Sequence, residues 1–155
     1  MRKIFLNERN KIIAKATIAH VVTYLACGAF FSQLFSYDDS LFEAMGFKPM
    51  DEINGVAIII GQIIRGILVG MVVWWIKDSI IGKKLGWCKL WAILVILGII
   101  NTYGPAHGSI EGLIYLVPVD VPANASLSVF EVLTQPLLFS IIVTFQRKKK
   151  QENNK

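Results

Sequence analysis

Four long apolar stretches constrain the fold of this chain of 155 residues more than any other feature. They run over residues 16–36, 53–76, 87–103 and 127–146. A helix needs about 20 apolar residues to cross the hydrocarbon core of a bilayer. Four crossings leave no room for a separate soluble domain, since such domains begin at about 50 residues. The sequence therefore predicts a single all-α domain, an integral membrane bundle of four transmembrane helices.

The basic residues follow the ends of these stretches. Of the 16 Lys and Arg residues, 14 fall in residues 1–15, residues 77–89 and the basic tail 147–155. Basic residues beside apolar spans mark cytoplasmic loops and attract anionic lipid headgroups. We therefore interpret the net charge of +5 as contact with the cytoplasmic face of a bilayer, not with nucleic acid. Both termini are predicted in the cytoplasm, and the location is predicted to be a bacterial cytoplasmic membrane.

The segments outside the spans predict interfacial structure. Residues 1–15 are basic and amphipathic and are expected to lie on the inner membrane surface. Residues 37–52 hold five acidic side chains against one lysine, and Ser40 with Glu43 fits a capping box, which predicts a short outer interfacial helix. Residues 104–126 carry no Lys or Arg and an apolar run too short to cross, which predicts a re-entrant outer cap. An inner aromatic belt is predicted for Trp74, Trp75, Trp87 and Trp91.

Arg65 is the most informative polar residue, because it lies near the middle of the second stretch. A charge at that depth costs at least about 2.5–3.5 kcal/mol on insertion scales, so a compensating group is expected. Gln62 shares its helix face, and Glu131 and Gln135 share a face of the fourth span. We predict a polar column of these four residues descending from the outer surface. Direct pairing of Arg65 with Glu131, and a purely structural role that locks the helices, both remain open.

Neighbouring residues add expectations about packing. Gly66 and Gly70 form a small-xxx-small pair, a candidate contact in a homo-oligomer. Pro136 lacks an N–H and should free the carbonyl of Val132 for a ligand or for Arg65. Three polar residues of the first span are expected to form interhelical hydrogen bonds: His20, Thr23 and Tyr24.

The segment after the third span carries a second polar group. Asn101 and Tyr103 are expected to line the mouth of the column. His107 and Glu111, four residues apart, fit an acid–base pair or simply a capped turn with a favourable helix N-terminus. Two ligands do not make a zinc centre, which takes three or four, so no metal or cofactor is predicted.

Neither cysteine is expected to form a disulfide, because Cys27 and Cys88 should lie at opposite depths, too far apart to be bridged. The chain contains no Cys-x-x-Cys, Walker, Gly-x-Ser-x-Gly or His-Glu-x-x-His motif. The motifs therefore point to no particular enzyme class.

These features favour a small multi-pass membrane protein that binds or transports a small polar or anionic ligand through the column around Arg65, open to the outer face. Four helices are few for a complete pathway, so a homo-oligomer or a larger membrane partner is expected. One alternative is an intramembrane enzyme acting on a lipid-borne substrate, with Glu111, His107 or Glu131 as acid–base groups. Another is a non-catalytic regulatory or immunity-type membrane subunit.

Overall fold

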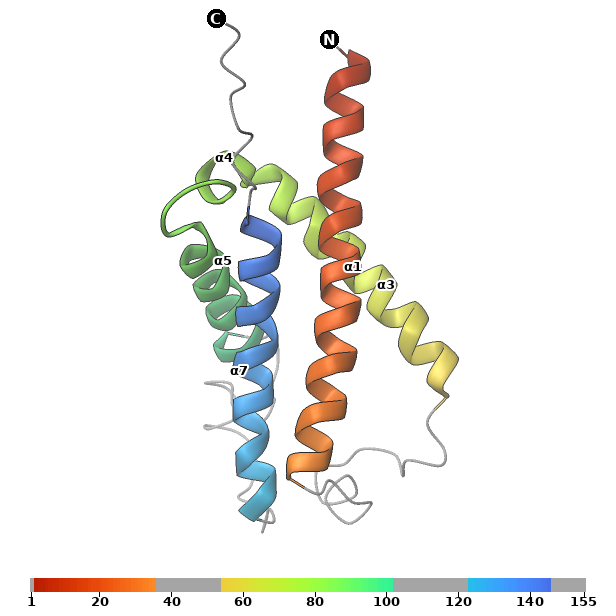
Figure 1. Ribbon diagram of the computed structural model, residues 1–155, viewed down its shortest axis with the longest axis vertical. Helices are drawn as coiled ribbons and strands as arrows, with labels where there is room; N and C mark the ends of the chain where they lie inside the picture. Colours follow the sequence, from red (N-terminus) through yellow and green to blue (C-terminus); the bar gives the residue numbers. More distant parts are fainter. Residues whose placement is uncertain (1, 36–53, 102–122, 146–155) are drawn as a thin grey trace, which may run out of the picture.

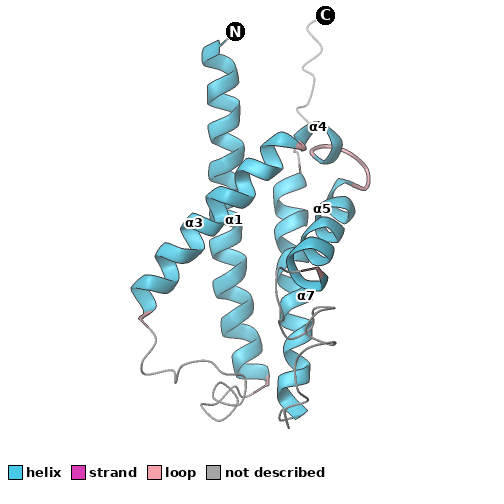
Figure 2. Cartoon of the chain, turned by 180° about the vertical axis from the view of Figure 1, so that it is seen from behind, coloured by secondary structure: helices cyan, strands magenta, loops and turns pink. Residues whose placement is uncertain are grey.

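The computed structural model describes residues 2–35, 54–101 and 123–145, and within these ranges the ordered elements are all helical. The long helices are α1 (Arg2–Leu34), α3 (Gly55–Trp75) and α7 (Ala123–Thr144). The short α4 (Lys77–Ile80) leads into α5 (Gly86–Val95), which continues as the π-helical turn η2 (Ile96–Ile100). α1 and α7 run antiparallel side by side, α3 crosses α1 obliquely, and α5 lies along α7 (Figures 1 and 2).

This arrangement confirms the all-α class, and a helix lies within each of the four apolar stretches. Two segments are long and apolar enough to cross a membrane, Leu6–Leu34 and Gly55–Trp75. The other two apolar helical segments, Gly86–Ile100 and Val129–Thr144, are shorter. The predicted interfacial helix and outer cap lie outside the described residues.

The expectation for residues 1–15 is wrong in one respect. They do not form a separate surface segment, because α1 runs without interruption from Arg2 to Leu34 and is straight in Figure 1. No glycine or proline occurs between Arg2 and Cys27 to break the helix. Ile12 also packs against the core of the bundle, which ties this part of α1 to the other helices.

The contact between α1 and α3 depends on two glycines. A Cβ atom at Gly66 would lie 2.9 Å from Cα of Thr17, and one at Gly70 would lie 3.1 Å from Cα of Ile13. Both contacts are with backbone, so the helices approach closely because these residues have no side chain. The small-xxx-small pair is therefore used inside the chain, and this face is not free for an oligomer contact.

α1 and α7 pair in a constant antiparallel register. An added Cβ at Gly28 would lie 3.7 Å from Oε1 of Glu131, and the His20 ring meets Phe139 eight residues further toward the N-terminus of α1. At the end of the pair, Nζ of Lys15 donates to backbone carbonyls of α7. The core lies where α1, α3, α5 and α7 come together, around Ala16, Ala19, Val73, Ile80, Leu90, Phe139 and Val143.

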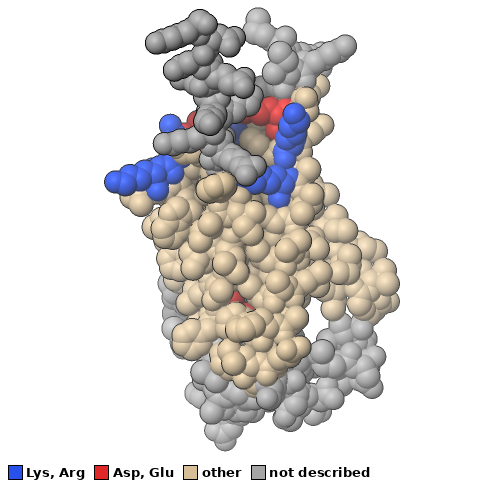
Figure 3. Space-filling view, viewed as in Figure 1, with Lys and Arg blue, Asp and Glu red and all other residues tan. Residues whose placement is uncertain are grey.

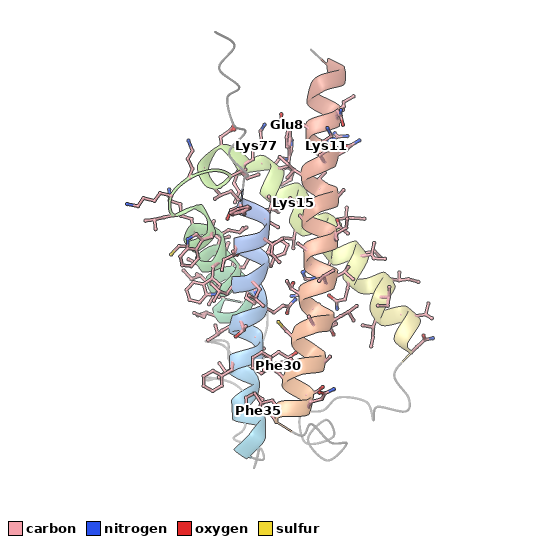
Figure 4. All side chains as sticks on the ribbon, in the orientation of Figure 1. Glu8, Lys11, Lys15, Phe30, Phe35 and Lys77 are labelled. Carbon is pink, nitrogen blue, oxygen red and sulfur yellow. The ribbon has the colours of Figure 1, made fainter. Side chains whose placement is uncertain are left out.

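The start of α1, the α4 region and the end of α7 meet at one end of the molecule, called here the basic end (Figure 1). Nζ of Lys77 lies 2.8 Å from a carboxylate oxygen of Glu8. Nζ of Lys15 donates to the carbonyl oxygens of Val143 at 3.0 Å and Phe145 at 2.9 Å, which satisfies groups left unpaired at a helix C-terminus. Figure 4 shows Glu8, Lys11, Lys15 and Lys77 at this end and Phe30 and Phe35 toward the other.

The turn between α4 and α5 requires glycine at two positions. Gly82 has φ 71°, a left-handed conformation that favours glycine, and its N–H donates to the carbonyl of Thr144 at 3.3 Å. A side chain at Gly86 would overlap the carbonyl of Ile80. These glycines let the chain reverse direction directly above the end of α7.

The four tryptophans predicted to form an inner aromatic belt differ in their exposure. Trp74 is buried, with Nζ of Lys77 4.2 Å from the centre of its ring. Trp91 is half-buried, and its indole N–H donates to the carbonyl of Leu133 at 3.1 Å. Only Trp75 and Trp87 are exposed. The indole N–H of a tryptophan inside a bundle needs an acceptor. For Trp91 this acceptor is a carbonyl of α7.

Candidate functional site

His20 occupies the point where α1 meets both α3 and α7. Its Nε2 atom lies 3.0 Å from Oε1 of Gln62 on α3. Its ring meets that of Phe139 on α7 edge to face, with centroids 6.0 Å apart. The histidine is buried, and with the amide oxygen facing the ring, Nε2 is the donor of this bond. The sequence-based expectation of an interhelical hydrogen bond is confirmed for His20.

The buried hydroxyls of Thr23 and Ser140 differ in their hydrogen bonding. The hydroxyl of Thr23 donates within α1, to carbonyls of Ala19 and His20 at 2.8 and 3.2 Å, so it does not bridge helices. The Ser140 hydroxyl is fully buried and has no hydrogen-bond partner within the described part of the chain. The interhelical expectation is therefore wrong for Thr23.

Arg65 lies three residues after Gln62, on nearly the same face of α3. The three side chains form a gradient in which His20 is buried, Gln62 is half-buried and Arg65 is exposed. Within residues 2–35, 54–101 and 123–145, the structure gives Arg65 no ion pair. We call His20, Gln62 and Arg65 the Arg65 cluster.

The closest packing of α3 against α1 begins just after Arg65, at Gly66. Val69, one turn toward the C-terminus, packs against the core, and Val73 is fully buried. In the preceding turns the isoleucines are largely exposed, Ile64 at 54% and Ile60 at 53%. From here toward Gly55 the helix diverges from α7 (Figures 1 and 2). Arg65 therefore lies where α3 leaves the other helices.

Glu131 is not part of this cluster. It lies beside Gly28, whereas Gly66, next to Arg65, lies beside Thr17. These α1 positions are eleven residues apart, which is about 16 Å along a helix. Glu131 and the α3 turn that carries Arg65 therefore lie beside different levels of α1.

The predicted column is thus divided between two helix pairs. The constant register of α1 and α7 puts Gln135, four residues after Glu131, opposite Tyr24 on the α1–α7 contact. Gln62 and Arg65 belong instead to the α1–α3 contact. His20 contacts both helices, and it is the residue that links the two parts.

The backbone of α7 just before Pro136 has a partner on another helix. The sequence predicts that Pro136 frees the carbonyl of Val132 for Arg65 or a ligand, and this stays a prediction. The next carbonyl, that of Leu133, accepts a hydrogen bond from the indole N–H of Trp91. The local backbone is therefore bonded to α5.

The remaining predicted site residues fall mostly outside the described ranges. Asn101 is exposed and caps η2, with its N–H donating to the carbonyl of Ile96 at 2.8 Å. Tyr103, His107 and Glu111 lie outside the described residues. Both cysteines are free thiols, as predicted.

Two hollows open on the described surface, and neither is lined by a residue of the Arg65 cluster. One lies at the basic end and is lined by Glu8, Ile12, Lys77, Asp78, Ile81 and Lys83. The other, called here the crossing groove, lies where α1 and α3 cross, and is lined by Asn10, Ile13, Ala14, Thr17, Ile18 and Ile67.

No known family, curated protein or solved structure matches this chain significantly. Its function must therefore be argued from the arrangement of its own side chains.

Proposed function

We propose that this chain is an integral membrane protein whose four crossings are α1, α3, α5 with η2, and α7, with the basic end on the cytoplasmic side. Large apolar side chains cover the outside of the helices, and on α3 alone seven of them are 38–55% exposed: Ile59, Ile60, Ile63, Ile64, Ile67, Leu68 and Val72. Water-soluble monomers rarely expose a continuous apolar surface of this kind.

The distribution of charge supports the same placement. In Figure 3 the visible Lys and Arg side chains gather at the basic end, above a surface that is almost free of charge. Such a separation is typical of a membrane protein, where lysine and arginine flank the cytoplasmic side of the apolar spans. Fractionation of cells into soluble and membrane pools, followed by extraction of the membranes at high pH, tests this proposal. Release of the chain by alkali would contradict it.

Within that membrane body, we infer that the Arg65 cluster binds a small anionic or polar ligand. The observation that carries this proposal is the exposed Arg65 in the middle of an apolar helix, one turn from the part-buried His20–Gln62 hydrogen bond. A charge at this depth requires an opposite charge or polar partner. Arginine binds carboxylate and phosphate groups through two parallel hydrogen bonds. A bound anion would therefore stabilise both the guanidinium and the ligand.

The position of Arg65 in the middle of an apolar helix favours transport as the activity. In this proposal the ligand enters from the outer face past His107 and Glu111. The chain is small, so we expect it to act as an oligomer. Because Gly66 and Gly70 are covered by α1, an oligomer would use another face, and the uncovered N-terminal half of α3 is the natural choice.

The test is ligand-induced stabilisation of the purified chain in detergent. The probes are inorganic phosphate and a series of small carboxylates, and the readout is the thermal midpoint. A ligand at one hundred times its Kd adds about 2.7 kcal/mol to the folded state. Arg65→Gln should abolish this gain, His20→Gln should reduce it, and Lys84→Gln, which removes an exposed charge at the basic end, should leave it unchanged.

Two outcomes would contradict this function. Equal stabilisation of wild type and Arg65→Gln would remove Arg65 from the site. No stabilisation by any anion, together with purification of the chain in a stable complex with a larger membrane protein, would favour the regulatory-subunit alternative.

A further inference from the structure

The crossing groove is a separate feature from the Arg65 cluster. It has a volume of about 360 Å³ and lies between α1 and α3. Ile67 is the residue of α3 that lines the groove. It follows Arg65 by two residues, so the two side chains point about 160° apart around the helix axis. The groove therefore opens on the opposite side of α3 from the guanidinium.

Its floor is apolar because its one hydroxyl is already bonded. Oγ1 of Thr17 donates to the carbonyl of Ile13 at 2.9 Å, one turn back in the same helix. The close approach of Gly66 to Thr17 brings α3 against this part of α1 and forms one wall of the groove. Ile13, Ala14, Ile18 and Ile67 provide the rest of its apolar lining.

The end of the groove nearest the basic end is polar. Asn10 lines it, and Nε of Arg9 lies 3.4 Å from Oδ1 of Asn10, which holds the guanidinium beside the opening. Glu8, the residue before Arg9, is paired with Lys77 at 2.8 Å, so its charge is offset. From Asn10 to Ile18 the groove follows α1 for about 12 Å.

We propose that the crossing groove binds one acyl chain of an anionic phospholipid, whose phosphate lies against Arg9 and Asn10. The groove changes along its length from polar and basic to apolar, in the same order as a lipid changes from headgroup to chain. Basic pockets between helices on the cytoplasmic side commonly bind anionic headgroups. The proposal rests on the membrane placement above but not on a ligand at Arg65.

The test measures lipid retained by the full-length chain. The protein is reconstituted in a mixture of phosphatidylglycerol and phosphatidylcholine, extracted in mild detergent, and examined by native mass spectrometry. Wild type should retain phosphatidylglycerol in preference to phosphatidylcholine. Arg9→Gln should weaken that retention about fivefold, which corresponds to about 1 kcal/mol for one basic side chain near anionic lipid. Lys11→Gln, its neighbour outside the groove lining, should have a clearly smaller effect.

A second pair of variants tests the apolar part. Ala14→Phe fills the groove and should abolish retention of the lipid, whereas Ala26→Phe, at an exposed position of α1 outside the groove, should not. Circular dichroism checks that both variants remain helical. Equal retention by Ala14→Phe and wild type, or equal retention of the two lipids, would overturn the proposal. Anion binding at Arg65 is a separate measurement, so the two proposals can fail independently.

Discussion

Replacement of Gly66 by alanine tests the α1–α3 contact directly. The new Cβ would lie 2.9 Å from Cα of Thr17 and 3.2 Å from its carbonyl oxygen. These are backbone atoms, so the clash is relieved only if the two helices move apart. On the same helix Gly61 has no heavy atom within 4 Å of an added Cβ. Gly61→Ala is therefore the matched control.

The expected magnitude follows from two opposing effects. Alanine stabilises a helix interior by about 0.5–1 kcal/mol relative to glycine, and this gain applies to both variants. Overpacking of a close contact costs about 1–3 kcal/mol, and this loss applies only at Gly66. Gly66→Ala should therefore be about 1–3 kcal/mol less stable than Gly61→Ala, whatever the helix gain in this solvent.

Unfolding of the detergent-solubilised chain by SDS, followed by circular dichroism, measures this difference. Adding Thr17→Ala to Gly66→Ala should restore little stability, because it removes the methyl contact at 3.2 Å but leaves the backbone contact at 2.9 Å. If Gly66→Ala were as stable as Gly61→Ala, the close approach of α1 and α3 would be refuted. Complete rescue by Thr17→Ala would refute the role assigned to the backbone.

Three further predictions concern the other contacts between helices. Lys15→Met should cost about 1 kcal/mol, the value of a typical hydrogen bond, and should speed hydrogen exchange in the last turn of α7; unchanged exchange there would contradict the capping. Trp91→Phe should cost about 1 kcal/mol in SDS unfolding because it removes one donor, and Trp87→Phe less; equal losses would contradict the bond to α7. Glu8→Gln should cost less than about 1 kcal/mol, because its pair with Lys77 is partly exposed, and a loss that persists in high salt would argue against an ion pair.

Most of the helix positions could be predicted from the sequence. The apolar pattern predicts a span from residue 53, and α3 begins at Gly55 after Asn54, whose Oδ1 accepts hydrogen bonds from the N–H groups of Val56 and Ala57. Apolar length and turn residues act locally, so they are visible in one sequence. The expectation that residues 1–15 form a surface segment separate from the first span is wrong, because a change from basic to apolar composition does not end a helix.

The partners of the polar side chains could not be predicted in the same way. Counting depth from the outer end of each span puts Gln62 beside Gln135. That count assumes that the spans run parallel, but α3 crosses α1 obliquely (Figure 1) and its glycines bring it close to Thr17 and Ile13. The tilt of a helix is set by its packing against neighbours. The sequence identifies His20 as a hydrogen-bonding residue, but its partner depends on this tilt.

The position of Arg65 restricts the chemistry of any partner that covers the N-terminal half of α3. The isoleucines from Ile59 to Ile64 are exposed, and Arg65 lies just before the close contact of Gly66 with α1. A partner that covers these isoleucines would also bury the Arg65 guanidinium. A charge without a partner is costly at that depth. When one member of a buried, hydrogen-bonded charge pair is removed, the loss is about 2–5 kcal/mol, largely because the other charge stays buried without a partner. A partner without an anionic group would therefore be disfavoured, and one that carries a carboxylate or phosphate would be selected. If the proposed membrane placement holds, Arg65 would therefore select the chemistry of any ligand or neighbour at this face.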